Sequence, residues 1–305
     1  MNTIVFAYPG NERLANHLCE SLGYEKGKFV MHNFPDGETY ARLESDVKGK
    51  NAIIVCSLDR PDSKLIPLYF LSAIISDAGA FKISLIAPYL AYMRQDKQFN
   101  PGECVTSHHF AKLLSSFIDE LVTIDPHLHR IPSLDRIYSI HTITLHCAQI
   151  ISAWIKNNIS NPLLIGPDGE SKQWVSEVAA AAGARYTVLN KMHIGDNKVK
   201  VSVPHIEKYR KTHTPVIVDD IISSGKTMIE TLHHLRQAGT LPPVCLGIHA
   251  IFAGDSYNQI KEAGSAKIVS CNTVTHTSNI INLDNLITEA VKDIHPLKPK
   301  KSVRV

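Results

Sequence analysis

Short, almost continuously apolar segments alternate with longer helical segments along the chain, and this alternation most constrains the fold. The apolar segments are rich in β-branched residues, as are strands that are buried on both faces of a parallel sheet. The predicted strands are 2–9, 50–58, 82–89, 120–125, 161–168, 185–190, 215–220 and 244–252. The predicted helices are 12–23, 64–79, 108–118, 171–183 and 227–239. Several of these end in glycine, a common helix stop, and the alternation predicts an α/β protein with right-handed crossovers.

The length of the chain predicts two domains, because 305 residues are about twice the usual domain size. Segments 53–86 and 162–189 share one plan: a strand, a Pro-Asp turn, Ser-Lys, a helix, Ala-Gly-Ala and a second strand. This match favours two similar domains that join near 140–150.

Composition is ordinary for a soluble globular protein, with 44% hydrophobic and 20% charged residues. No apolar run approaches the ~20 residues of a membrane span, and no basic segment followed by an apolar one opens the chain. The six cysteines are scattered and form no CxxC pair, which is typical of reduced thiols. We therefore expect a cytoplasmic protein without a membrane partner.

The basic residues of the tail 295–305 account for the positive net charge. Of the total of +3, four charges come from Lys298, Lys300, Lys301 and Arg304, so the remaining body carries −1. A nearly neutral body argues against nucleic acid as the partner, because nucleic-acid binding requires a basic face. We expect the tail to be a solvated chain end.

The loops that follow the predicted strands hold nearly every charged or hydroxyl-rich cluster of the sequence. In open parallel sheets, ligands bind outside the carboxyl ends of the strands, so these loops predict the position of the site. They are Pro35–Glu38, Tyr89–Thr106, Asp125–Arg130, Gly166–Ser171, Lys191–Val199 and Asp219–Thr227.

The last of these loops ends in Ser-Gly-Lys-Thr but is not the phosphate loop of an ATPase. That loop needs a glycine five residues before Gly225, and this position is Asp220, preceded by Asp219. Small residues at a helix start instead suit one phosphate monoester, and two carboxylates suit sugar hydroxyls or hydrated Mg²⁺. The pattern predicts a site for ribose 5-phosphate, formed by Asp219, Asp220, Ser223, Ser224, Gly225, Lys226 and Thr227.

This segment resembles the phosphoribosyl-pyrophosphate binding motif of type I phosphoribosyltransferases and of ribose-phosphate pyrophosphokinases. Four further segments resemble the pyrophosphokinase family, in its order and over nearly the whole chain: FPDGE at 34–38, PYLAYMRQDK at 88–97, DPHLHR at 125–130 and GPDGE at 166–170. The resemblance implies two similar phosphoribosyltransferase type I-like domains, each a mainly parallel sheet flanked by helices. Residues 1–145 would form the ATP side and residues 146–305 the ribose 5-phosphate side.

The reaction implied by the resemblance joins ATP and ribose 5-phosphate for nucleotide biosynthesis. The C1 hydroxyl attacks the β-phosphorus, AMP leaves, and 5-phosphoribosyl 1-pyrophosphate forms. Such a transfer depends on positioning, Mg²⁺ and positive charge around the transferred group, without a covalent nucleophile.

The resemblance also assigns roles to single residues. Arg94, Gln95 and Asp96 would bind ATP; His127 would contact the triphosphate and the metal, and Asp168 would contact Mg²⁺ at the ribose 5-phosphate site. Lys191, on a polar loop that could close, would be the catalytic lysine, with His193 beside it.

The loop from Phe34 to Glu38 would reach a neighbouring subunit, as it does in the resembling family. Phe34 would stack on adenine, while Asp36 and Glu38 would accept hydrogen bonds from its amine. The chain would then be a homo-oligomer, either a dimer or a dimer-based hexamer.

The sequence departs from the family pattern at three positions. Most members carry Lys-x-Arg where this chain has Lys191-Met192-His193, and histidine is only partly charged near neutral pH. Ser223 stands where many members have Asp, as in archaeal-type branches, and Lys226 stands where Gly is usual. Lys226 can contact the phosphate or point to solvent from the first helical turn.

Two alternatives remain open at the level of sequence. A non-catalytic regulatory paralogue would explain His193 and Lys226 but not the remaining site residues. A phosphoribosyltransferase would use the phosphate loop but leave the FPDGE and Arg94 segments without a purpose. Formation of AMP that depends on ribose 5-phosphate separates the pyrophosphokinase from both.

Overall fold

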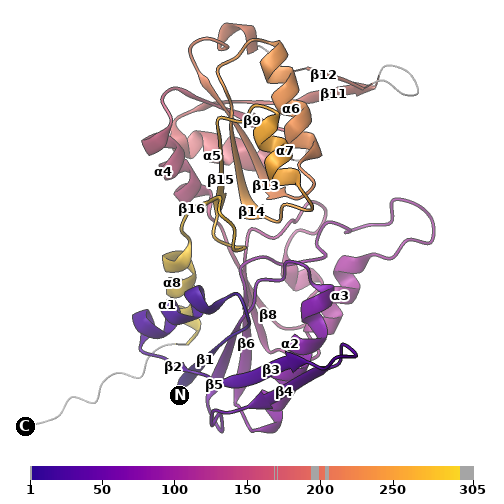
Figure 1. Ribbon diagram of the computed structural model, residues 1–305, viewed down its shortest axis with the longest axis vertical. Coiled ribbons are helices and arrows are strands. Elements are labelled where there is room, and N and C mark those ends of the chain that lie inside the picture. The colour runs from indigo at the N-terminus through magenta and orange to yellow at the C-terminus, as the bar shows by residue number, and fades with distance from the viewer. Residues whose placement is uncertain (1, 168, 170, 194–198, 203–205, 296–305) are drawn as a thin grey trace, which may run out of the picture. The chain divides into compact units, whose positions relative to one another are not determined.

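The computed structural model describes residues 2–295 except 168, 170, 194–198 and 203–205, and it divides into two compact units (Figure 1). The described residues of Met1–Leu145 and Asp284–Val305 form the first unit, and those of His146–Leu283 form the second unit. None of the described helices combines the length and the apolar character that a membrane crossing needs.

The first unit is a six-stranded sheet in which every pair of neighbouring strands is parallel. Its order is β2 (Glu25–Lys26), β1 (Thr3–Ala7), β5 (Asn51–Val55), β6 (Lys82–Ala87), β7 (Glu120–Ile124) and β8 (His141–Leu145). One side of the sheet carries α1 (Glu12–Leu22) and α8 (Asp284–Ile294), and the other carries α2 (Asp62–Asp77) and α3 (Thr106–Leu114) (Figure 1). The apolar residues of β5, β6 and β7 are buried between these helix layers.

The second unit has a six-stranded sheet with the same order and the same parallel pairing. Its strands are β10 (Arg185–Val188), β9 (Pro162–Gly166), β13 (Thr214–Ile222), β14 (Val244–Ala250), β15 (Lys267–Cys271) and β16 (Asn279–Ile281). Its helices are α4 (Ala148–Asn158), α5 (Lys172–Ala182), α6 (Lys226–Gln237) and α7 (Ser256–Glu262). In both sheets the strand that comes second in the chain lies at the edge, beside the first. The predicted α/β fold with two similar parallel-sheet domains is therefore confirmed.

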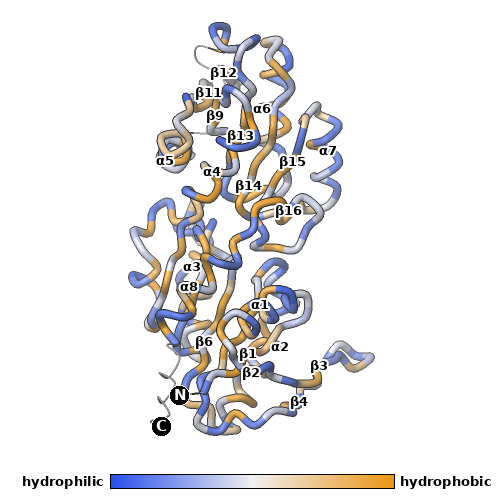
Figure 2. Tube along the Cα trace, turned by 90° about the vertical axis from the view of Figure 1, so that its left-hand side faces the viewer, coloured by the Kyte–Doolittle hydropathy of each residue, from blue (hydrophilic) through white to orange (hydrophobic). Residues whose placement is uncertain are grey.

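Each unit also carries an antiparallel hairpin between the second and third strands of its sheet. These hairpins pair β3 (Phe29–Asn33) with β4 (Thr39–Leu43), and β11 (Asn190–His193) with β12 (Val199–Ser202). The β3–β4 hairpin projects away from its sheet (Figure 2). Two short 3-10 helices, η1 (Leu134–Arg136) and η2 (Ile206–Lys208), lie in loops.

The two units are similar, as predicted, but the two segments that match in the sequence do not occupy corresponding positions in the two sheets. The match of 53–86 with 162–189 equated β5 with β9, whereas β5 is the third strand of its sheet and β9 is the first of its own. By position, β1 corresponds to β9, and β5 corresponds to β13. A strand, turn, helix and strand recur throughout any α/β sheet, so such a unit matches several others equally well.

Helix α8 belongs to the first unit, although the sequence placed its residues in a second domain that extends from 146 to 305. It contacts α1 and β8, as α4 contacts α5 and β16 in the second unit. Its inward stripe consists of Asp284, Ile287, Thr288 and Val291. The helix thus covers in the first unit the face that α4 covers in the second.

A buried carboxylate anchors the end of α8 to the sheet. The Glu120 side chain is 1% exposed, and its oxygens lie 2.8 Å from His141 Nδ1, 2.9 Å from Lys82 Nζ and 2.8 Å from Ser84 Oγ. His295, the residue after α8, places its Nε2 2.9 Å from Ser84 Oγ and 3.5 Å from Glu120. Tyr24 donates a 2.5 Å hydrogen bond to the carbonyl of His295, which fixes the same turn.

This cluster makes the stability of the fold depend on the charge of Glu120. Burial alone would raise the pKa of this carboxyl, but the hydrogen bonds from His295, His141, Lys82 and Ser84 outweigh burial and hold the pKa well below its ordinary 4.5. A folded-state pKa below the unfolded value stabilises the fold above pH 4.5. This contribution is lost as the pH falls further below that value.

We expect Glu120→Gln to lower the free energy of unfolding at pH 7 by about 3 kcal/mol, because it leaves the buried Ser84 and His295 and the partly exposed Lys82 without their anion. The difference from the wild type should shrink as the pH falls below 4.5. Denaturant unfolding at a series of pH values measures both effects. The control is Glu44→Gln, because Glu44 is 38% exposed and pairs with Arg42 at the surface, where a loss below about 1 kcal/mol is expected. Equal losses in the two variants would contradict the anchoring role.

Candidate active site

The predicted phosphate loop lies at the carboxyl edge of the second sheet. Strand β13 ends at Ile222, two residues beyond its predicted end, and α6 begins at Lys226. Gly225 precedes the helix with a φ of 70°, a left-handed conformation that glycine adopts without strain. The first N–H groups of a helix have no partner within the helix, and the helix dipole adds positive potential there. This terminus has the properties of a site for one phosphate group.

The residues that follow β14 hold this loop in place. The carbonyl of Ser223 accepts hydrogen bonds from Ala253 N at 3.1 Å and from Ser256 Oγ at 2.9 Å. A Cβ on Gly225 would lie 2.9 Å from Cδ1 of Ile260 in α7, closer than real Cβ contacts occur. Glycine at position 225 is therefore required both by its φ and by the close approach of α7.

The acidic pair lies within β13 and not after it. Asp219 and Asp220 are both partly exposed, and each carboxylate accepts a hydrogen bond from the next backbone N–H, at 3.0 and 2.7 Å. These local bonds orient the two carboxylates. Because they stand on the strand that leads into the phosphate loop, they can receive the hydroxyl groups of a sugar whose phosphate lies at α6.

In the first unit, the predicted ATP residues follow two neighbouring strands, β6 and β7. Arg94 and Gln95 lie in the loop after β6, where Arg94 is exposed and Gln95 Oε1 accepts a 3.2 Å hydrogen bond from Thr106. His127, partly exposed, lies in the loop after β7. Since β6 and β7 are parallel neighbours, their carboxyl ends bring the two loops to the same edge of the sheet.

In each of these two loops, a residue with left-handed backbone lies two positions before the predicted ATP contact, Arg94 or His127. Tyr92 has a φ of 62°, and Asp125 has a φ of 34°, conformations that are uncommon outside glycine. The phenol of Tyr92 donates to Asp62 and its ring lies 4.7 Å from Phe110. The hydrogen bond to Asp62, together with burial, raises the pKa of Tyr92 to about 12. Such strained residues concentrate at functional sites, where the surrounding structure fixes them.

Asp96 has a different environment from its predicted ATP-binding neighbours. Its side chain is 1% exposed, and its two oxygens accept hydrogen bonds from the guanidinium of Arg130 at 2.9 Å and from the backbone N of Arg130 at 3.1 Å. This geometry favours a supporting role for Asp96 over direct contact with ATP. No pattern in the sequence points to a role for Arg130, because nothing local shows that these two loops are joined.

The predicted adenine-binding residues lie in the turn of the β3–β4 hairpin. Phe34 is 45% exposed and its ring lies edge-on, 5.5 Å from that of His32 and 6.2 Å from that of Tyr40. The turn is closed by Asp36, whose Oδ1 accepts a 3.1 Å hydrogen bond from the backbone of Glu38. The hairpin thus presents an aromatic ring and two carboxylates to its surroundings.

Comparison with known proteins shows the family of this chain. The N-terminal domain of ribose phosphate pyrophosphokinase matches residues 3–117, and a phosphoribosyl transferase domain matches residues 133–284. The chain is 30% identical over 257 residues to the ribose-phosphate pyrophosphokinase of Saccharolobus solfataricus, covering 82% of this chain and 86% of that protein. The chain belongs to the ribose-phosphate pyrophosphokinase family.

Other relatives agree over an even larger share of the chain. The ribose-phosphate pyrophosphokinase of Methanobrevibacter smithii is 27% identical over 294 residues, which cover 93% of this chain and 98% of that protein. The crystal structure of phosphoribosylpyrophosphate synthetase from Mycobacterium smegmatis has a TM-score of 0.85 at 18% identity. It covers 97% of this chain and 99% of that chain, so the two share the fold throughout.

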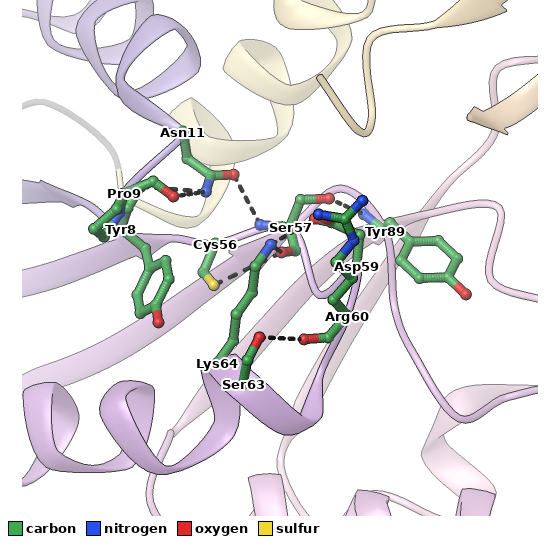
Figure 3. A network of polar contacts seen from close by, with 10 residues as sticks. All are labelled: Tyr8, Pro9, Asn11, Cys56, Ser57, Asp59, Arg60, Ser63, Lys64 and Tyr89. Carbon is green, nitrogen blue, oxygen red and sulfur yellow. Dashed lines mark hydrogen bonds and ion pairs between the residues drawn. The ribbon is translucent and has the colours of Figure 1, made fainter. Parts of the chain in front are cut away.

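Within this pyrophosphokinase fold, the first unit has a network of polar side chains at the position that corresponds to the phosphate loop of the second unit. The loop after β5, which corresponds to the phosphate loop after β13, forms the network in Figure 3. Lys64 Nζ lies 2.5 Å from Asp59 Oδ1 and donates a 2.8 Å hydrogen bond to the carbonyl of Ser57. Asn11 accepts from Ser57 N at 2.9 Å, and Ser57 Oγ accepts from Tyr89 N at 3.2 Å. Lys64, in the first turn of α2, is thus neutralised internally, which disfavours phosphate binding to its ammonium group.

The roles of all the predicted site residues remain predictions, and for three residues the structure gives no side-chain position. Asp168 lies outside the described residues. The backbone of Lys191 and His193 lies in β11, but their side chains lie outside the described part of the chain.

We expect Gly225→Ala to lower both the thermal stability and the affinity for ribose 5-phosphate. The matched control is Gly239→Ala, because Gly239 has a similar φ of 66° but nothing within 4 Å of its Cβ position. Both variants should lose about 1–2 kcal/mol to left-handed strain, and only Gly225→Ala should lose more through the contact with Ile260. Thermal unfolding and a titration with ribose 5-phosphate measure the two effects. Equal behaviour of both variants would show that α7 does not support the loop.

Proposed function

We propose that this chain transfers the diphosphoryl group of ATP to the C1 hydroxyl of ribose 5-phosphate, giving 5-phosphoribosyl 1-pyrophosphate and AMP. The observation that carries the proposal is the phosphate loop at α6, preceded on the same strand by two partly exposed carboxylates. This arrangement suits a sugar phosphate better than a nucleotide triphosphate. The chain's relatives carry the name ribose-phosphate pyrophosphokinase, which fits the same pair of substrates.

Each substrate has its own set of groups in this proposal. The phosphate of ribose 5-phosphate binds the N–H groups of the loop from Ser223 to Thr227, and its hydroxyls bind Asp219 and Asp220. The triphosphate of ATP binds Arg94, whose guanidinium is a fixed cationic fork, and Gln95 beside it. The C1 oxygen then forms a bond to the β-phosphorus while the bond from that phosphorus to the α-phosphate oxygen breaks. AMP leaves, and the hydroxyl proton passes to solvent.

We assign His127 to the Mg²⁺ that accompanies ATP, and Asp168 to a Mg²⁺ contact at the ribose 5-phosphate site. Among the described residues no group of three or more His, Cys, Asp and Glu side chains is placed to hold a metal ion. Mg²⁺ needs no such cage when ATP is bound, because it is usually held by one or two protein groups, substrate phosphates and water. When bound, the ion neutralises charge on the triphosphate and so lets an alcohol approach the phosphorus. Lys191 and His193 would add positive charge to the transferred group.

Two surfaces of the first unit support the proposal of a homo-oligomer. Helix α2 buries Leu68, Leu71 and Ile75 against its sheet, yet its outer side exposes Ile66, Tyr69 and Phe70 by 54%, 42% and 36%. A helix that is apolar on both sides is typical of one that is covered on both sides, and we assign the cover to a second copy. The exposed Phe34 hairpin would then reach the ATP site of that copy, so the working enzyme is a homo-oligomer.

We expect AMP to form from ATP only when ribose 5-phosphate and Mg²⁺ are both present. Phosphorus NMR follows the reaction directly, because AMP and a diphosphate on C1 give signals that differ from those of ADP. Excess chelator should abolish the reaction, and Thr227→Val should raise KM for ribose 5-phosphate far more than KM for ATP. No AMP under any of these conditions would favour the non-catalytic paralogue, and full activity in chelator would refute the role of Mg²⁺.

Mixing two inactive variants tests the shared site. Phe34→Ala lacks the aromatic group of the hairpin, and Asp168→Ala lacks the proposed metal contact. In a mixed dimer, the hairpin of the Asp168→Ala chain completes the site of the Phe34→Ala chain, so one of two sites is whole. Random reassociation should therefore restore roughly a quarter of the wild-type activity. No recovery, despite subunit exchange shown by mass-tagged chains, would place the whole site within one chain.

A further inference from the structure

We infer that Arg130 is a second ATP-binding arginine of the first unit and that buried Asp96 is the residue that positions it. The inference rests on the proposed function, since it extends the ATP site formed by Arg94 and His127. It gives Asp96 a role different from the one predicted by sequence, and it gives Arg130 a role that no motif assigned.

The burial of Asp96 is the first observation that supports this inference. A carboxylate that is 1% exposed has lost its water and must be paired, and here both oxygens are engaged by one residue. Oδ1 accepts from the Arg130 guanidinium at 2.9 Å, and Oδ2 accepts from the Arg130 backbone at 3.1 Å. An ionised carboxylate is an acceptor only, so it would repel a triphosphate that approached it directly. The pair instead ties the loop after β6 to the loop after β7.

The second observation is that the Arg130 guanidinium is held in place while the side chain as a whole remains 34% exposed. Its Cζ lies 5.8 Å from the ring of Phe99, and Lys97 Nζ lies 5.1 Å from the same ring. Phe99 is itself 57% exposed, so an aromatic ring with two cations beside it is presented to solvent. Cations near an aromatic face are attracted to it, which further fixes the side chains of Arg130 and Lys97.

An arginine that is fixed in advance binds phosphate better than a mobile one. A free arginine loses rotamer freedom when it binds, whereas Arg130 has already lost it through Asp96 and Phe99. The guanidinium can bind phosphate oxygens through donors that Asp96 does not use, because it has five N–H groups in a planar fork. Arg130 lies three residues after His127, in the loop that already carries the predicted contact to the triphosphate.

An equilibrium titration with ATP and Mg²⁺ tests the assignment, and its readout does not depend on turnover. We expect Arg130→Ala to weaken ATP binding about 10- to 100-fold, and Arg130→Lys to weaken it less, because charge remains but the fork is lost. Affinity for ribose 5-phosphate should stay unchanged in both. The matched control is Arg136→Ala, which removes an exposed arginine of η1 in the same unit and should leave ATP binding unchanged.

A double-mutant cycle separates positioning from direct contact. We expect Asp96→Asn to weaken ATP binding about tenfold in the wild type but less than about twofold further in the Arg130→Ala background. The amide oxygen of asparagine can still accept the backbone hydrogen bond, and circular dichroism with thermal unfolding verifies that each variant is folded. A full tenfold effect of Asp96→Asn in the absence of the arginine would mean that Asp96 contacts ATP itself. Unchanged ATP affinity in Arg130→Ala would overturn the inference, while absence of AMP from wild-type enzyme would refute the proposed function alone.

Discussion

Parallel pairing of all neighbouring strands in two six-stranded sheets determines where this protein can bind its ligands. Strands that run in one direction gather the loops that follow them at one edge of each sheet, where the backbone is free to take irregular shapes. Of the five non-glycine residues with left-handed backbone in the described part of the chain, four lie in such loops, namely Arg60, Tyr92, Asp125 and Phe252. These strained backbone conformations therefore lie at the edges of the sheets that also carry the candidate binding residues. The buried strands that lead into these loops are rigid and fix the loop conformations.

The two units share one topology but differ in the loop that follows the third strand of each sheet. In the second unit this loop is short and open and starts a helix at Gly225, which suits a phosphate. In the first unit the same position holds an ion pair between Lys64 and Asp59, so the ammonium group of Lys64 is already neutralised. The two units thus share one strand order, and the side chains of this loop make the two units differ in their suitability for binding phosphate.

Sequence reasoning succeeded where the signal was local and failed where it depended on contacts between distant segments. The eight predicted runs became strands, most of them because burial on both faces requires continuous apolar sequence, although β10 is a partly exposed edge strand. The loop at Gly225 was visible because its residues are contiguous. Strand β2 has two exposed residues and gave no such signal. The return of α8 to the first unit and the pairing of Asp96 with Arg130 join segments that lie far apart in the chain. No local pattern of residues encodes these contacts, so only the structure could show them.

The central claim is that the duplicated fold carries a single sugar-phosphate site, at the phosphate loop of the second unit. Isothermal titration of the full chain with ribose 5-phosphate tests it most directly, because the stoichiometry counts the sites. We expect one molecule bound per chain, with affinity that falls strongly in Thr227→Val and is retained in Lys64→Gln. Two molecules per chain, or binding that survives Thr227→Val and disappears in Lys64→Gln, would contradict the account.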